Sequence, residues 1–306
     1  MSLLAKSSKL ASRANNCSSN ASAYVTYALL LLFFSFGINI CSADDSESAV
    51  KPSASSLTSS DWNLEQKLSQ TETLRQFRVD NTVELSQNER KVSFESSTIF
   101  YDDYVFDFVG DNGEIVVYSF VEHKFQLLDP IRRIRAELDL VEIERFLTCV
   151  KPMLRERDDK FVNFMLDPKF ETSRKEDELF FQSKFIDYHI ETEAFESEQV
   201  SDAYFQFADA LGKLNVYMNP GSVTPLARLE ANKTLAEGAR FPRKIVTNVY
   251  PNGKTIFAKT VRIVNESTIA RRLSERDRSR VNRAIHFFAQ FQLVSFQTYF
   301  EKTAQH

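Results

Sequence analysis

Residues 104–129 of the chain read YVFDFVGDNGEIVVYSFVEHKFQLLD, and the prediction of the fold begins from their pattern. Tyr104, Phe106 and Phe108 alternate with other residues, and a period of two predicts a β-strand. The dipeptide Asn112-Gly113 follows, and it predicts a hairpin because both residues accept a positive φ. Two more strands are expected after it, over 114–120 and 125–128. The stretch therefore predicts an antiparallel meander with short loops.

The rest of the chain extends this pattern and has no regular alternation of strand and helix. Further strands are expected over residues 131–138, 179–190, 244–250 and 254–264. Helices are expected over residues 61–78, 139–151, 160–166, 199–218 and 225–235, and from Ser274 through Tyr299. Such an order of elements predicts the α+β class, with an antiparallel sheet in a single domain over residues 61–306.

The composition narrows the class of function. The chain has 306 residues, of which 27 are Phe and only 7 are Gly. Scarce glycine argues against nucleotide-binding loops, and abundant Phe suits a wide sheet or an apolar pocket. A formal net charge of −4 makes nucleic acid an unexpected partner. Because the sequence contains no short catalytic, metal or nucleotide motif, we expect a protein without enzymatic activity, cofactor or metal.

The N-terminal residues have the pattern of a secretory signal. Lys6, Lys9 and Arg13 precede an apolar run over 23–40, and small residues end at Ala43. We therefore expect a signal peptide over residues 1–43, cleaved near Ala43, and an exported protein of the periplasm or the extracellular space. The alternative is an uncleaved membrane anchor, because about 18 apolar residues can just span a bilayer. Residues 44–60 are rich in Ser and are expected to form a disordered tether.

The hairpin stretch resembles the core of a known group of proteins. Asp111-Asn112-Gly113, the strand that runs to Tyr118, and Phe125-Gln126-Leu127-Leu128 are similar to the LolA/LolB/RseB-like group of exported proteins. The resemblance covers residues 90–140. It implies a strongly curved antiparallel sheet, an incomplete barrel, with helices packed on its concave face. It also implies that a lipid or a lipoprotein tail binds between sheet and helices.

On this interpretation the aromatic side of the meander lines the ligand site. The expected lining consists of Tyr104, Phe106, Phe108, Val117, Phe125 and Leu127. Arg133 and Arg135 would share one face of a strand, where they could meet lipid head groups or an acidic protein of the cell envelope. The alternative for these arginines is cross-strand pairing with carboxylates such as Glu114 or Glu137.

One cluster could carry chemistry. Asp187, His189 and Glu191 would share a strand face and could act as metal ligands or as an acid–base set, although an exposed polar face is the alternative. The leading hypothesis is an exported, non-enzymatic binding protein for an apolar ligand. The alternatives are a structural or interaction module with a closed core and, third, a hydrolase that uses His189.

Overall fold

The computed structural model describes residues 76–87, 90–110, 113–156, 159–218, 226–255 and 260–303. The expectations for the signal segment (1–43) and the tether (44–60) lie outside the described residues. Within them, the strands form one open, twelve-stranded sheet in the order β12-β6-β5-β4-β3-β2-β1-β11-β10-β9-β8-β7. Neighbouring strands are antiparallel, except that β12 pairs parallel with β6. The expected α+β class with an antiparallel sheet is therefore confirmed.

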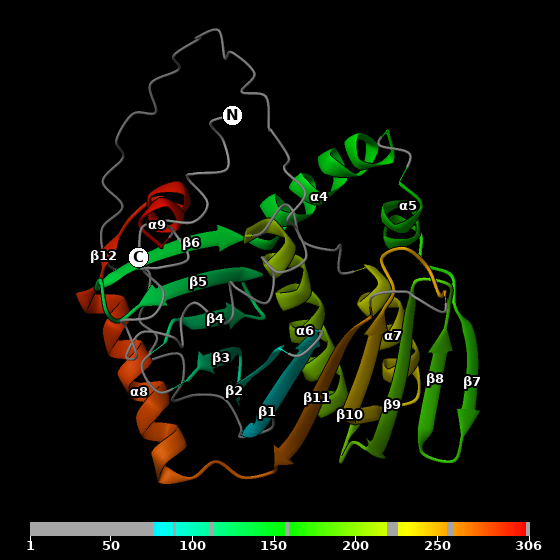
Figure 1. Ribbon diagram of the computed structural model, residues 1–306. Helices are drawn as coiled ribbons and strands as arrows, with labels where there is room; N and C mark the ends of the chain where they lie inside the picture. Colours follow the sequence, from blue (N-terminus) through cyan, green and yellow to red (C-terminus); the bar gives the residue numbers. More distant parts are fainter. Residues whose placement is uncertain are drawn as a thin grey trace, which may run out of the picture.

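The strands have the following bounds: β1 Gln76–Gln87, β2 Arg90–Tyr101, β3 Tyr104–Val109, β4 Ile115–Ser119, β5 Lys124–Asp129, β6 Ile134–Asp139, β7 Glu171–Lys175, β8 Glu178–Gln182, β9 Ile186–Ala194, β10 Arg240–Val249, β11 Val261–Ala270 and β12 Gln292–Leu293. The helices are α4 Leu140–Arg155, α5 Lys160–Leu166, α6 Glu198–Met218, α7 Leu226–Glu237, α8 Glu275–Gln290 and α9 Phe296–Thr303. Figure 1 shows the strong twist of the sheet, since β6 runs across the view and β7 stands nearly upright.

One face of the sheet, here called the inner face, carries α6 as its central cover. A row of cross-strand neighbours runs over this face from Phe77 through Phe100 to Tyr118. The Phe77 and Phe100 rings stack at 4.0 Å, and Phe207 of α6 meets the Phe100 ring edge-on at 5.8 Å. This cluster extends to α4 and α9, and a second cluster joins β8–β11 to α5 and α7. Aromatic rings therefore fill the space between the inner face and its helices.

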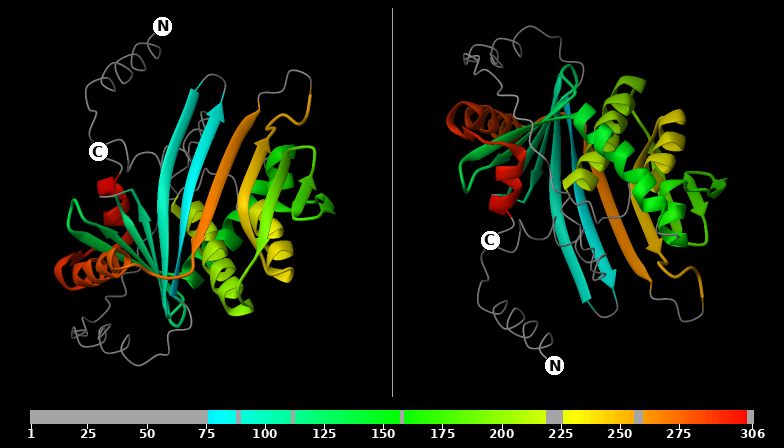
Figure 2. Two further views of the ribbon diagram at one scale, coloured as in Figure 1. Left: turned by 90° about the horizontal axis from the view of Figure 1, so that it is seen from below. Right: turned by 90° about the horizontal axis from the view of Figure 1, so that it is seen from above.

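The opposite face, here called the outer face, is covered by α8 over part of its width. Ile99 and Phe106 pack with Val281 and Ala284 of α8 in a third cluster. Figure 2 shows α8 beside the meander strands, on the other side of the sheet from α6 and α7. The expectation that the helices pack on one concave face holds for α4–α7, while α8 lies on the outer face.

Several expected elements differ from the structure, among them the strand expected over 254–264, which starts as β11 only at Val261. The expected helix over 61–78 is wrong at its end, because residues 76–78 begin β1; the rest lies outside the described residues. The expected strand over 179–190 is two strands, separated by a turn in which Ser183 Oγ donates to the Ile186 carbonyl. The expected last helix ends at Gln290, because the backbone N–H groups of Gln292 and Val294 donate to carbonyls beside and within β6.

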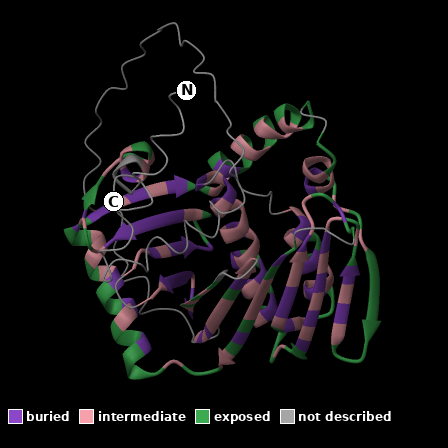
Figure 3. Cartoon of the chain, in the orientation of Figure 1, coloured by how far each residue is buried: buried purple, intermediate pink, exposed green. Residues whose placement is uncertain are grey.

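The strands of the sheet differ in how far their residues are buried. Strand β5 has buried residues on both of its faces, because α6 lies on one side and α8 on the other. Strand β7 is exposed at all of its residues, and Figure 3 shows it as the exposed last strand of the sheet. No helix in the described ranges combines the length and the apolar character needed to cross a bilayer.

Candidate functional site

The six residues expected to line a ligand site lie on two opposite faces of the sheet. In the register of the meander, Phe106 lies opposite Val117, and Val117 lies opposite Gln126. The neighbours of Gln126 in β5 consequently point to the other face. Tyr104, Phe106, Phe108 and Val117 pack in the cluster under α8, whereas Phe125 and Leu127 pack in the cluster under α6. Each of the six is buried, and their role in binding stays a prediction.

The two arginines expected at a head-group site do not share a strand face. Arg133 lies in the turn before β6 with a φ of 55°, and its side chain is exposed. Arg135 lies within β6, where it donates to Glu137 at 2.8 Å and to Gln126 at 3.3 Å. Glu137 is one of the carboxylates named in the alternative for these arginines, but it lies on the same strand as Arg135 and not across from it. Contact with a head group or an envelope partner stays a prediction.

The cluster around His189 lies on one side of β9, as expected, but its members have separate partners. Lys254 Nζ lies 2.8 Å from the Asp187 carboxylate. The His189 ring stacks on Phe180 at 4.6 Å, and its Nε2 lies 3.4 Å from a carboxylate oxygen of Glu178. These contacts are those of a polar sheet surface. In the described part of the chain, no three His, Cys, Asp or Glu side chains gather as a metal site would require.

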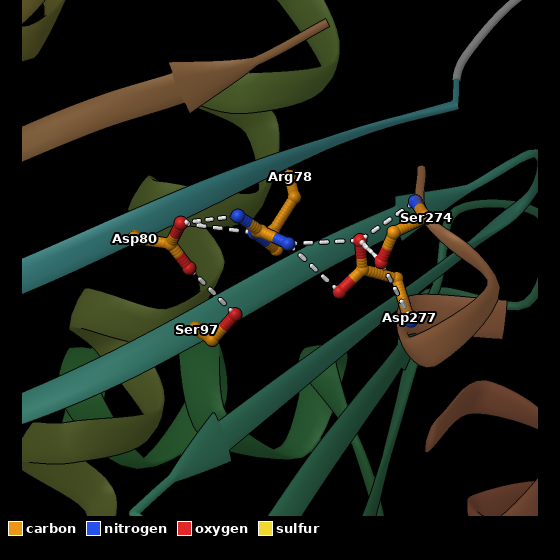
Figure 4. Close-up of polar contacts among 5 residues, drawn as sticks. All are labelled: Arg78, Asp80, Ser97, Ser274 and Asp277. Carbon is orange, nitrogen blue, oxygen red and sulfur yellow. Dashed lines mark hydrogen bonds and ion pairs between the residues drawn. The ribbon is translucent and has the colours of Figure 1, made fainter. Parts of the chain in front are cut away.

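A polar network joins β1 and β2 to the start of α8 (Figure 4). Arg78 donates from Nη1 to both oxygens of Asp277, at 2.9 and 2.8 Å, and from Nε to Asp80 at 2.9 Å. Ser97 Oγ donates to the other Asp80 oxygen at 2.8 Å. Asp277 and Ser274 also form a reciprocal capping box at the N-terminus of α8. We call these five residues the Arg78 clamp.

The charged groups of the Arg78 clamp pair with one another. The Asp277 side chain is 2% exposed. Burial acts to raise its pKa, but hydrogen bonds from Ser274 and Arg78 outweigh burial and leave the pKa below its usual value. A carboxylate held in this way is ionised and already paired. The clamp therefore serves to fasten α8 to the outer face, and it offers no open position for a ligand.

A different site lies where α5 meets the turn between β8 and β9. An open surface hollow of about 370 Å³ lies there. Its lining comes from three separate segments and defines what we call the α5 pocket: Phe164, Lys169, Phe170, Glu171, Gln182, Ser183, Lys184 and Phe185. None of the six residues expected to line a site belongs to it.

Local sequence features hold the aromatic walls of the α5 pocket in place. Asp159 caps α5 by accepting hydrogen bonds from the backbone N–H groups of Phe161 and Val162. The cap fixes the start of the helix and therefore the position of Phe164 on it. The Phe164 ring lies 5.6 Å from Phe170 and 5.5 Å from Phe185. These rings are only half-buried, so the pocket exposes aromatic surface.

The Phe170 ring connects the pocket to the core. It lies 5.8 Å from Phe181 and 5.7 Å from Tyr188, both of which are buried on the inner face. The Ser183 hydroxyl accepts from the backbone N–H groups of Phe185 and Ile186 and so shapes the turn that carries Phe185. The Phe170 wall of the pocket thus packs directly on residues of β8 and β9.

The lining of the α5 pocket carries more positive than negative charge. Its lining contains Lys169 and Lys184 against the single carboxylate of Glu171. Lys169 lies 3.7 Å from Asp167, whereas no carboxylate among the described residues lies within ion-pair distance of Lys184. The Lys184 ammonium lies 5.6 Å from the centre of the Phe185 ring. A cation beside an aromatic wall suits a ligand with an apolar body and an anionic end.

A close backbone approach supports Lys184 from the other side. Gly253 has a φ of 76°, and a Cβ added to it would lie 2.8 Å from Lys184 Cε. The backbone N–H of Lys254 also donates to the Lys184 carbonyl at 3.1 Å. Glycine at this position therefore permits both the turn and the position of the lysine stem.

Comparison with known proteins gives distant similarities among solved structures. No family model matches the sequence, and no curated protein matches it. Among solved structures, PNGF-II is similar at 8% identity and a TM-score of 0.28 over 74% of this chain, which spans 32% of the length of PNGF-II. The LolA superfamily protein NE2245 from Nitrosomonas europaea is similar at 9% identity and a TM-score of 0.24, over 70% of this chain and 94% of that one.

A LolA superfamily protein is thus among the structures found. At such TM-scores neither similarity carries an argument about ligand or activity. Those questions depend on the residues of the α5 pocket.

Proposed function

We propose that the protein is an exported, non-enzymatic binding protein that holds a lipid-like molecule, with an apolar chain and an anionic end, in the α5 pocket. The observation that carries this proposal is the pocket itself, which is lined by half-buried Phe164, Phe170 and Phe185, and in which the Lys184 ammonium lies 5.6 Å from the centre of the Phe185 ring. Apolar area removed from water would supply most of the binding free energy, at about 25 cal/mol per Å² before entropic costs. The lysine would select the charged end of the ligand.

Palmitate is the probe for this proposal, and hexadecanol is its uncharged counterpart. We expect saturable binding of palmitate, measured by displacement of a fluorescent fatty acid from the full-length protein. Phe185→Ala removes one aromatic wall and is expected to weaken binding of both probes by about tenfold. Phe146→Ala is the matched control, because this half-buried ring packs on Tyr217 at 5.1 Å and does not line the pocket.

Lys184→Gln separates the charge from the apolar wall. We expect it to weaken palmitate binding by about two- to fivefold, the range for an exposed ion pair, and to leave hexadecanol binding unchanged. Lys151→Gln on α4 is the control. Equal binding of palmitate by the Phe185→Ala and Phe146→Ala variants would remove the α5 pocket from the proposal, and absence of palmitate binding would end it.

Export is the second part of the proposal, and it is supported by the basic, apolar and small-residue order of residues 1–43. When the full-length chain is expressed in cells with a secretory route, we expect the mature protein to begin at Asp44. N-terminal sequencing of the secreted or periplasmic fraction measures this directly. Recovery of the chain in the membrane fraction with residues 23–40 intact would support the anchor instead.

One observation favours a second candidate function, that of a structural or interaction module. Phe106 and Phe125, which were expected to line a cavity, are instead packed in closed clusters on opposite faces. If the α5 pocket binds neither palmitate nor hexadecanol, a module of this kind becomes the better interpretation of the fold.

A further inference from the structure

Strand β7 is an open edge of the sheet. It is the last strand in the order, and its described backbone pairing is with β8 alone. All of its residues, Glu171–Lys175, are exposed. At the opposite end of the sheet, β12 is a strand of two residues that leads into α9. The edge of β7 therefore presents backbone N–H and C=O groups that can pair with another strand.

We propose that β7 pairs antiparallel with β7 of a second copy of this chain, around a twofold axis. The argument begins with geometry. Outward-pointing peptide groups recur at every second residue of a strand. Two identical edges can therefore pair only if residues with outward-pointing groups face each other. The numbers of two facing residues must then be both odd or both even. This condition leaves few registers, and their side-chain pairs distinguish among them.

In the central register, Ser173 lies opposite the partner's Ser173, and Glu171 lies opposite the partner's Lys175. Symmetry repeats the second pair, so two opposite-charge pairs form on one face of the joined strands. A shift of the centre to Thr172 brings Lys175 opposite the partner's Lys169. A shift of the centre to Arg174 brings that arginine opposite its own copy. Only the central register therefore avoids like charges and gains attraction.

Charge complementarity thus identifies the occupant of this edge as another copy of the chain. A run of charges of one sign would have blocked such pairing, which is how many exposed edges are protected. The contact is short, so it buries much less than the roughly 1,000 Å² of a stable interface. We expect self-association that depends on protein concentration. This inference does not rest on the proposed ligand.

Charge reversal tests the register. Glu171→Lys alone and Lys175→Glu alone each convert both attractive pairs into like-charge pairs, and we expect at least about tenfold weaker dimerisation from either. The double variant, Glu171→Lys with Lys175→Glu, restores opposite charges and is expected to restore the wild-type dimerisation constant. Sedimentation equilibrium of the full-length protein measures all four constants. Lys175 lies opposite Glu178 of β8, so Lys175→Glu also brings two carboxylates together within one chain, and thermal unfolding of each variant checks that the fold is retained.

Crosslinking gives an independent measurement. With Cys17, Cys41 and Cys149 replaced by serine, Ser173→Cys places one thiol opposite its own copy at the Cα separation of facing residues, which a disulfide can bridge. Thr172→Cys is the control, because its own copy is displaced by two residues. Rapid crosslinking by oxidised glutathione of the first variant alone supports the proposal. A wild-type chain that stays monomeric at millimolar concentration, or a double variant that fails to recover, overturns it.

Discussion

The substitution Arg78→Met is expected to lower the free energy of unfolding by about 3 kcal/mol at pH 7. It leaves the Asp277 carboxylate, which is 2% exposed, without a cation among the described residues that contact it. An uncompensated buried charge costs about 3–5 kcal/mol. The lower end of this range applies, because Ser274 continues to donate to Asp277 and because Arg78 itself is 27% exposed. Methionine retains the apolar stem of the arginine, so the packing against the sheet is kept.

Urea unfolding followed by far-UV circular dichroism measures this effect. Arg243→Met is the matched control, because Arg243 forms a 2.6 Å ion pair with Glu191 while both side chains are largely accessible, at 57% and 31% exposure. Such surface pairs contribute about 0–1 kcal/mol. If the two substitutions destabilise the protein equally, the Arg78 clamp does not fasten α8 as we infer.

The pH dependence of the Arg78 clamp follows from the direction of the Asp277 shift. Its pKa in the folded state lies below the ordinary value of 3.8, because the hydrogen bonds from Ser274 and Arg78 outweigh burial. The folded protein therefore binds this proton less tightly than the unfolded chain does. The resulting stability is present above about pH 4 and is lost as the pH falls through the folded pKa. The difference between wild type and Arg78→Met is accordingly expected to shrink in acid.

The sequence predicts the meander well because its turns are determined locally. The turns before β4 and β5 depend on residues beside them, and both strands form where the alternation places them. Strand β1 has no such signal. It pairs with β2, which follows it in the chain, and with β11, where Ala270 lies opposite Arg78. The pairing with the distant β11 cannot be recognised from periodicity, and helical spacing before residue 78 favoured the wrong element.

The failure at the predicted ligand site has a different cause. Alternation shows which residues of one strand share a face, but β5 is apolar on both faces because helices cover both. Phe125 and Phe106 were therefore assigned to one lining, although they point in opposite directions. The α5 pocket was missed because Phe164, Phe170 and Phe185 lie in three separate segments. Only the packing of α5 against the hairpin of β8 and β9 brings them together.

The pKa of Asp107 is shifted upward, in the opposite direction to that of Asp277. We therefore expect Asp107→Asn to stabilise the protein by about 2–3 kcal/mol at pH 7.5. Asp107 lies on β3 between Thr98 and Val116 and is 6% exposed. Burial raises its pKa to about 6, although the Thr98 hydroxyl donates to it at 2.6 Å and Arg280 attracts its charge. Asparagine keeps an oxygen for Thr98 and carries no charge, so it avoids the cost of an ionised buried group.

The direction of the Asp107 pKa shift determines the pH range over which this residue changes the stability of the protein. The folded protein binds the Asp107 proton more tightly than the unfolded chain, whose pKa is near 3.8. The stability from this carboxyl is therefore fully present below about pH 4 and is lost as the pH rises through about 6. Wild type and Asp107→Asn should have similar stability at pH 4 and diverge by pH 7.5 in urea unfolding, with Asp202→Asn on the exposed side of α6 as control. A variant less stable than wild type at pH 7.5 would mean that the Asp107 carboxylate is stabilised in the fold, and that its charge helps to hold β2, β3 and α8 together.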